Sequence, residues 1–191
     1  PDAANTRGIF QNVAADVEIE FELAKKDPNG NCTDGITRTK SNLSLIGNNS
    51  VKNLVHWDRK KYYNIWVTRN VANTKRGDPN GVTLGYSYFP RAVGQTYRTD
   101  GTIIRHDALG STGVGTFIHS NSRTLTHETG HYLALYHPFD NGGSGSGCNS
   151  GDFCQDTPPV DKANFQCFLG VNSCNNDNPD QPDQIENYMD Y

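Results

Sequence analysis

Apolar and acidic residues alternate most regularly from Val17 to Leu23, where Val, Ile, Phe and Leu are separated by glutamates. This period of two predicts a β-strand with one solvated face. Three further short apolar stretches predict strands at residues 62–68, 84–89 and 102–106. From Phe139 to Ile185 little periodicity is present, and a loop of that length is either functional or held by cross-links.

Residues 123–134 are predicted to form a helix that carries His127 and His131, four positions apart. This spacing places both imidazoles on one helix face, one turn apart. Glu128 follows the first histidine and can act on a water molecule rather than bind the metal. His137 lies six positions after His131, so the chain must turn at the end of the helix to bring the third imidazole back.

Three neutral imidazoles are a typical donor set for catalytic zinc, because they leave the fourth coordination position open for water. Zinc at such a site activates water and polarises a carbonyl group. Glu128 is then the candidate general base, which takes the proton from water and later delivers it to the leaving amine. The spacing of these residues therefore predicts a zinc hydrolase.

The composition indicates the number of domains, the kinds of partner and the cellular location. The 191 residues are only 34% hydrophobic and carry a formal charge of -4, so one domain or two small subdomains are expected and nothing indicates nucleic-acid binding. No apolar run approaches the roughly 20 residues of a membrane span. The five cysteines indicate disulfides and a secreted, extracellular protein. Zinc binding by cysteine is disfavoured because no C-x-x-C pair is present.

Several motifs together resemble the metzincin metallopeptidases. The run from His127 to His137 follows their zinc motif, and Asn187-Tyr188-Met189-Asp190-Tyr191 resembles their Met-turn. Within that clan, Leu135-Tyr136-His137 and residues 151–158 resemble the pappalysin family, in particular its secreted microbial (ulilysin- and cytophagalysin-like) branch. Weaker similarity lies upstream, at residues 27–30, 35–38, 63–67 and 84–90.

The resemblance implies an α+β fold of the metzincin type. A twisted mixed sheet with the zinc-site helix would form an upper subdomain at residues 1–137. A loop-rich lower subdomain, stapled by disulfides and ending at the Met-turn, would occupy residues 138–191. Together they would form one catalytic domain, which is expected to be a monomer, and the chain is expected to lack that domain's N- and C-terminal flanks.

The resemblance also assigns roles outside the zinc motif. Tyr191 would approach the zinc and stabilise the tetrahedral intermediate, with an ordinary packed aromatic as the alternative. Met189 would be a packing base under the zinc ligands. Asp152, the backbone carbonyl of Gln155, and Thr157 match a structural calcium site, which suits hard oxygen ligands. The same three residues could instead form an Asx-turn network.

The disulfide pattern follows from the resemblance as well. Cys148 should pair with Cys174, and Cys167 with a cysteine beyond residue 191. Cys32 and Cys154 are then left as a possible further pair, with a free buried Cys154 thiol as the alternative.

The strand at residues 84–89 is the candidate substrate strand. Leu84, Gly85, Tyr86 and Ser87 would line the upper rim of the cleft and pair with an extended peptide by β-augmentation. Pro90 would stop further pairing. An ordinary internal strand is the alternative.

The most direct functional interpretation is a secreted zinc endopeptidase that acts on protein or peptide substrates. The alternatives are a catalytically silent binding module with the same fold and, less favoured, a zinc hydrolase of non-peptide substrates. One departure from the metzincin pattern is Ala134, where a glycine normally ends the helix at positive φ. An alanine in that conformation is strained by about 1–2 kcal/mol. Either the turn differs, or the strain is tolerated.

Overall fold

The computed structural model describes residues 5–72, 82–90, 97–110, 123–140, 147–149, 151–165 and 168–190. Contacts within the chain define two units: Glu22–Ala134, and Pro1–Phe21 together with Leu135–Tyr191. We call these the sheet unit and the loop unit. The predicted boundary between upper and lower subdomains, at residue 137, remains a prediction.

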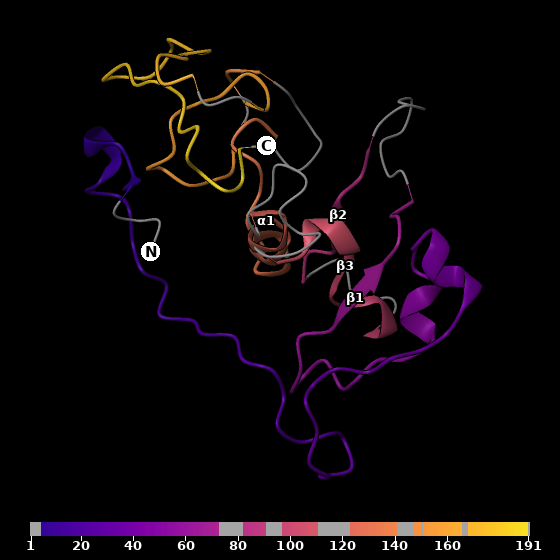
Figure 1. Cartoon of the computed structure of the whole chain (residues 1–191). Coiled ribbons are helices and arrows are strands. Elements are labelled where there is room, and N and C mark those ends of the chain that lie inside the picture. Colours follow the sequence, from indigo (N-terminus) through magenta and orange to yellow (C-terminus); the bar gives the residue numbers. More distant parts are fainter. Residues whose placement is uncertain are drawn as a thin grey trace. The chain divides into compact units, whose positions relative to one another are not determined.

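Regular structure is concentrated in the sheet unit (Figure 1). Its elements are the α-helix α1 (Arg123–Tyr132), the strands β1 (Ile65–Thr68), β2 (Gly85–Ser87) and β3 (Thr102–Arg105), and the 3-10 helices η3 (Asn42–Leu45), η4 (Val51–Asn53), η6 (Tyr97–Thr99) and η7 (His106–Ala108). In the loop unit, η2 (Gly8–Phe10) is a single 3-10 turn. No described helix is long and apolar enough to cross a bilayer.

The three strands form a mixed sheet in the order β1-β3-β2. β1 runs parallel to β3, with Ile65 opposite Thr102, and β2 runs antiparallel to it, with Tyr86 opposite Ile103. The mixed sheet agrees with the fold class expected from the sequence. The described strands are a little shorter than the apolar stretches that predicted them, because pairing ends before the apolar pattern does.

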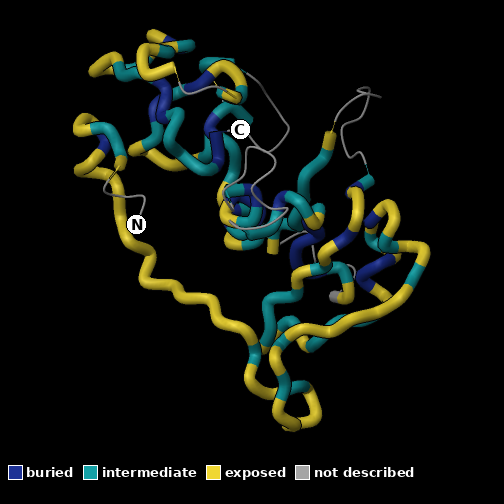
Figure 2. Tube along the Cα trace, in the orientation of Figure 1, coloured by how far each residue is buried: buried dark blue, intermediate teal, exposed yellow. Residues whose placement is uncertain are grey.

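The central strand β3 is the most buried part of the sheet, since Thr102, Ile103 and Ile104 are all fully buried. Ile103 packs with Val51 and Val71, and the partly buried rings of Trp66 and Tyr86 extend this core. Figure 2 shows buried positions gathered on β3 and on α1. The apolar β-branched residues of β3 thus explain both its strand conformation and its central place.

The helix α1 contacts β2 and β3. A hydroxyl cluster joins the helix to the sheet: Tyr63 OH contacts the Oγ1 atoms of Thr102 and, at 3.2 Å, Thr129, while Ser87 Oγ contacts Thr102 Oγ1. The Tyr63 ring also stacks on Tyr132, with 4.2 Å between ring centroids. These contacts fix the helix, and hence the histidines it carries, on one face of the sheet.

The strand predicted at residues 17–23 is not formed in the structure. The segment is exposed, with Val17 72% and Phe21 56% accessible, and it is extended without ladder pairing. Alternation of apolar and acidic residues predicts which face of a strand would be buried, but a strand also needs a partner edge for its backbone groups. The described residues do not supply one at this segment.

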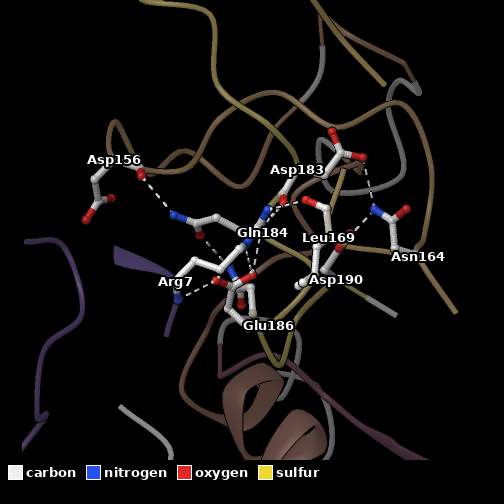
Figure 3. A network of polar contacts seen from close by, with 9 residues as sticks. Arg7, Asp156, Asn164, Leu169, Asp183, Gln184, Glu186 and Asp190 are labelled. Atoms are coloured by element: carbon white, nitrogen blue, oxygen red, sulfur yellow. Dashed lines mark hydrogen bonds and ion pairs between the residues drawn. The ribbon is translucent and has the colours of Figure 1, made fainter. Parts of the chain in front are cut away.

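The described part of the loop unit beyond Leu135 contains no helix or paired strand, and polar side chains organise it instead. Asp183 is fully buried, and its Oδ1 atom accepts hydrogen bonds from the backbone nitrogen (2.9 Å) and hydroxyl (3.1 Å) of Ser173. Asn164 Nδ2 donates to both Asp183 (3.1 Å) and Asp190 (2.9 Å). Arg7 binds Glu186 at 2.8 Å and the carbonyl of Leu169 at 3.0 Å (Figure 3).

Candidate metal centre

The three histidines singled out in the sequence lie together. One ring nitrogen from each of His127, His131 and His137 lies within 4.8 Å of the other two. Among the described residues, this is the group of three or more His, Cys, Asp or Glu side chains close enough to share a metal ion. Zinc bound at about 2.0–2.1 Å by neutral imidazoles needs such a convergent, all-nitrogen set. The residues present therefore fit a zinc ion.

Each histidine ring is held by its surroundings. His127 is buried, and its ring meets that of His131 edge to face, with centroids 4.7 Å apart. The Phe89 ring lies 5.3 Å from the ring of His131, and the Phe139 ring stacks on that of His137 at 4.8 Å. These aromatic contacts restrict the orientations of the imidazoles, which is a requirement for a preformed metal site.

The turn that leads to His137 is made at Ala134. The helix ends at Tyr132, where the Leu133 N–H still donates to the Thr129 carbonyl at 2.9 Å. Ala134 then takes φ of 74°, the left-handed conformation that usually belongs to glycine at this place. Of the two possibilities left open by the sequence, the structure shows the strained turn. The helix is two residues shorter than predicted because this turn closes it.

Glu128 lies deep in the sheet unit, with only 5% of its surface exposed. Burial raises the pKa of its carboxyl group to about 8, against the opposing effects of the Ser87 backbone N–H, which donates to it, and the Lys52 charge. Its Oε2 atom is buried without a hydrogen-bond partner. A cation held by the neighbouring histidines would act in the opposite direction, since positive charge favours the carboxylate.

Gly85 allows Glu128 to lie against β2. A Cβ atom at this position would lie 3.1 Å from Glu128 Cγ and 3.3 Å from its Oε1 atom, with the Ile103 carbonyl oxygen at 3.0 Å. The sequence predicts Gly85 at the rim of the cleft, facing a bound peptide. In the structure, the group that approaches is the Glu128 side chain.

Residues 187–190, which were expected to form a Met-turn, make a partly buried turn within the loop unit. Met189 is 5% exposed, and its N–H donates to Asn187 Oδ1 at 2.9 Å. The Asp190 carbonyl accepts from the Asn164 N–H at 2.9 Å, so the turn is tied to the polar network of Figure 3. Tyr191 lies outside the described residues. The packing role expected for Met189 remains a prediction.

The candidate calcium residues lie in a loop of tight turns. Asp152 Oδ1 accepts from the Cys154 N–H at 2.8 Å, which is an Asx-turn, and Phe153 between them has φ of 67°. Gln155 is exposed and Thr157 is half-buried. This turn is the alternative arrangement considered for these residues, and it leaves the calcium assignment as a proposal.

Two of the described cysteines form a disulfide, and the other two are free thiols. Cys148 and Cys174 form a disulfide with Cα atoms 5.4 Å apart, which is the pairing that the resemblance implied. Cys32 and Cys154, considered as a further pair, are both exposed free thiols in this structure, and their pairing stays a prediction. They belong to different units of the chain, and sequence alone does not determine connectivity. Cys167 lies outside the described residues.

Sequence reasoning missed one residue near this site. Lys52 is fully buried, and its charge acts on Glu128. The flanking Val51 and Asn53 give no periodic signal that would place this lysine inside the core. Only the assembled sheet shows the rings and carbonyls around it.

The fold and the histidine cluster together define a metzincin-type domain. A family model described as Pregnancy-associated plasma protein-A (Peptidase_M43) matches residues 46–191. The chain therefore belongs to the pappalysin family of metzincins.

Solved structures agree with this placement. The chain is 36% identical to mirolysin in complex with compound 9, with a TM-score of 0.80 over 100% of this chain and 69% of that one. For mature mirolysin of Tannerella forsythia in complex with a cleaved peptide, the identity is 35%, and the TM-score and the coverage of both chains are the same. The metzincin fold expected from the sequence is confirmed.

Curated relatives include fungal proteins named extracellular metalloprotease. The protein of Pyricularia oryzae is 42% identical over 115 residues, which is 59% of this chain and 37% of the relative. That of Arthroderma otae is 31% identical over 175 residues, or 91% of this chain and 56% of the relative. The chain thus spans about half or less of the length of these relatives.

Proposed function

We propose that this chain is the catalytic part of a secreted zinc endopeptidase. The observation that carries the proposal is the convergence of the His127, His131 and His137 nitrogens next to the buried Glu128 carboxyl group. Family membership and the relatives named extracellular metalloproteases support the same activity and location. The Cys148–Cys174 disulfide is also in keeping with an oxidising compartment.

The three imidazoles would hold zinc, which when bound supplies a Lewis acid that activates water and polarises a peptide carbonyl. Glu128 would accept the proton from water and return it to the leaving amine. The hydrogen bond from the Ser87 N–H and the packing against Gly85 would hold the Glu128 carboxyl group in position for this proton transfer. Tyr191 is proposed to stabilise the developing oxyanion, and Met189 to support the site by packing.

We further propose that the substrate lies along β2, with Leu84, Gly85, Tyr86 and Ser87 forming the rim. Among the described residues β2 pairs with β3 alone, so it is an edge strand of the sheet. It contacts α1, and Phe89 just beyond it touches His131. An extended protein or peptide substrate could add to such an edge through backbone hydrogen bonds, with little demand on its sequence.

The experiment that tests the zinc peptidase compares three variants in metal content and in casein cleavage. His131→Ala should lose both zinc and activity. Glu128→Gln should keep zinc and lose several orders of magnitude in activity, because the proton carrier is gone. His106→Ala, an exposed histidine outside the cluster, should keep both. Wild-type turnover by Glu128→Gln, or unchanged zinc in His131→Ala, would contradict the assignment.

Calcium at Asp152, Gln155 and Thr157 is proposed as a structural ion, supported by the oxygen-rich loop at residues 151–158. A ligand that binds only the folded state raises the melting temperature by mass action. A calcium-selective chelator should therefore lower the melting temperature of the zinc-saturated protein. Asp152→Ala should remove this response, whereas Asp161→Ala, at an exposed aspartate of the same unit, should keep it. An unchanged melting temperature on chelation leaves only the Asx-turn.

A further inference from the structure

Lys52 is an unusual residue to find at the centre of a small core. Its relative exposure is 0%, and it is the largest fully buried side chain among the described residues. Its Nζ atom donates to the carbonyl oxygens of Thr99, at 2.6 Å, and Gly101, at 3.0 Å. Burial of a charge costs several kcal/mol unless partners compensate for it. A lysine at this place therefore needs more explanation than an apolar residue would.

Three aromatic rings surround the same ammonium group. The Nζ atom lies 5.2 Å from the ring centroid of Trp66, 5.2 Å from that of Tyr86 and 4.9 Å from that of Tyr88. Each distance is within the range of a cation–π interaction, which strengthens when the cation is removed from water. The rings come from β1, β2 and the residue just after β2. We call Lys52, these three rings and the Thr99 and Gly101 carbonyls the lysine cage.

The lysine cage connects five parts of the sheet unit. Lys52 belongs to η4, Trp66 to β1, Tyr86 to β2, the Thr99 carbonyl to η6, and the Gly101 carbonyl to the turn that enters β3. Asn49 adds a link, since its Nδ2 atom donates to Tyr88 OH at 2.7 Å and Tyr86 OH donates to its Oδ1 atom at 3.1 Å. One ammonium group thus fixes β2 relative to the rest of the sheet.

β2 carries the cage and the Glu128 contacts on opposite faces. Side chains alternate along a strand, so Tyr86 and Tyr88 point to the side of Lys52, while Gly85 and Ser87 are on the side of α1. The close approach of Glu128 to the position of a Gly85 Cβ atom shows this second face directly. A displacement of the tyrosines would therefore move the backbone that receives Glu128.

The Asp100 carboxylate favours the charged form of Lys52. Burial lowers the pKa of the Lys52 ammonium to about 8, and the charge of Asp100 is the largest opposing influence. Asp100 is itself paired with Arg59 at 3.2 Å. The two carbonyl acceptors and the three ring faces around Nζ are the partners that a buried ammonium group requires.

We propose that Lys52 is a positioning residue of the peptidase site, which holds β2 where its backbone receives Glu128 and where its free edge can receive an extended peptide. This inference rests on the proposed roles of β2 and Glu128. Lys52 acts through β2 and contacts neither the metal ligands nor, by this proposal, the substrate. Its removal should weaken peptide binding by β2 and leave the histidine cluster intact.

The test uses Lys52→Met, which keeps the length of the side chain and removes its charge and donors. Lys60→Met, at an exposed lysine of the same unit, is the matched control. Binding of fluorescein-labelled casein is measured by anisotropy in the Glu128→Gln background, where cleavage is absent. Lys52→Met should weaken binding about tenfold, because the strand edge that receives the peptide is no longer preorganised. Zinc content should stay the same, and Lys60→Met should bind like its parent.

A second pair of variants covers the case in which Lys52→Met does not fold. Tyr88→Phe keeps the ring face toward the ammonium group and loses the hydroxyl contact with Asn49, whereas Tyr88→Leu loses the ring. If the lysine cage positions β2, Tyr88→Leu should weaken casein binding clearly more than Tyr88→Phe does. Equal effects of the two substitutions would contradict the proposal.

The outcomes separate this proposal from the peptidase function on which it rests. If Glu128→Gln cleaves casein at the wild-type rate, the peptidase assignment fails. If Glu128→Gln is inactive and binds casein, while the added Lys52→Met changes neither affinity nor zinc content, the positioning role alone fails. A loss of zinc in folded Lys52→Met would also overturn it, because the lysine would then support the metal site rather than β2.

Discussion

The two units of this chain are stabilised by different kinds of interaction. The sheet unit has paired strands, a helix and an apolar core around Val51, Val71 and Ile103. The described loop unit has no helix or paired strand beyond Leu135, and buried Asp183 and Asp190 occupy positions where apolar residues would be expected. In helices and sheets the backbone N–H and C=O groups bond to one another. In irregular segments they need side chains as hydrogen-bond partners.

This difference affects how each unit holds its own candidate residues. Helix α1 places His127, Glu128 and His131 through its fixed periodicity, and Gly85 of β2 leaves room for the Glu128 side chain. The turn around Met189 depends instead on individual contacts with Asn187 and Asn164. The first arrangement should tolerate many surface changes, while the second should be sensitive to single polar substitutions and to redox conditions.

The largest expected effect comes from breaking the sheet unit. Ile103→Ala removes a fully buried side chain from the centre of the core. Such substitutions lower the free energy of unfolding by about 2–5 kcal/mol, because contacts are lost and a cavity is left. Hydrogen exchange should accelerate first in β1, β2 and β3. Leu43→Ala, at an exposed leucine of the same unit, should change little. Equal effects of the two would contradict the placement of the core.

The loop unit should respond most to loss of its disulfide. Cys148 and Cys174 close a loop with a sequence separation of 26 residues. Replacing both by serine should lower the free energy of unfolding by about 3 kcal/mol, because the unfolded chain regains freedom. Limited proteolysis should then cut within residues 148–174 before the sheet unit. Cys154→Ser, at an exposed free thiol, serves as the control and should leave the cleavage pattern unchanged.

The sequence predicted the sheet unit better than the loop unit, and the reason is physical. Periodicity reports burial, so the strands around Trp66, Tyr86 and Ile103 and the zinc helix were all expected near their observed places. The same signal failed at Val17–Leu23, because alternation does not reveal whether a partner strand is available. In the loop unit, local sequence indicated a stapled loop but not which polar groups would be buried.

At the candidate site, too, local sequence patterns predicted neighbours along the chain but not partners distant in sequence. Fixed spacing predicted that His127 and His131 share one helix face, because the positions on a helix are determined by its geometry. The return of His137 also required a turn after the helix, which the zinc motif indicated. Lys52 could not be found in this way, since its partners Trp66, Tyr88 and Gly101 are distant in sequence. The positions of residues that act through long-range packing become visible only in the folded chain.

A smaller effect, which depends on pH, should distinguish the polar interior of the loop unit. Burial raises the pKa of the Asp190 carboxyl group to about 7, and the charges of Asp183 and Glu186 add to the rise despite the hydrogen bond from Asn164. Because this value lies above the unfolded value of about 3.9, the native state holds the proton more tightly. The contribution of this group to stability therefore declines as pH rises from about 4 to about 7.

Asp190→Asn should remove that decline. The variant should melt at a higher temperature than the wild type at pH 8 and at nearly the same temperature at pH 4, because only the charged form is disfavoured by burial. The difference in melting temperature between variant and wild type, measured across this range, isolates the group. Asp161→Asn, at an exposed aspartate, should give a flat difference. A flat difference for Asp190→Asn as well would mean that Asp190 titrates normally.

The smallest effect on stability is expected at Ala134, the last residue of the sheet unit. Its φ of 74° strains an L-residue by about 1–2 kcal/mol, and glycine adopts this conformation without that strain. Glycine also gains freedom in the unfolded chain, which offsets about 0.4–1 kcal/mol of the benefit. Ala134→Gly should therefore stabilise the protein by about 0–1.6 kcal/mol and raise its melting temperature by about 2–4 °C per kcal/mol gained. Ala108→Gly, at a buried alanine without positive φ, should lower it. If Ala134→Gly also lowers the melting temperature while zinc content stays constant, the turn after the helix is held by the alanine side chain, and the strain inferred from φ is absent.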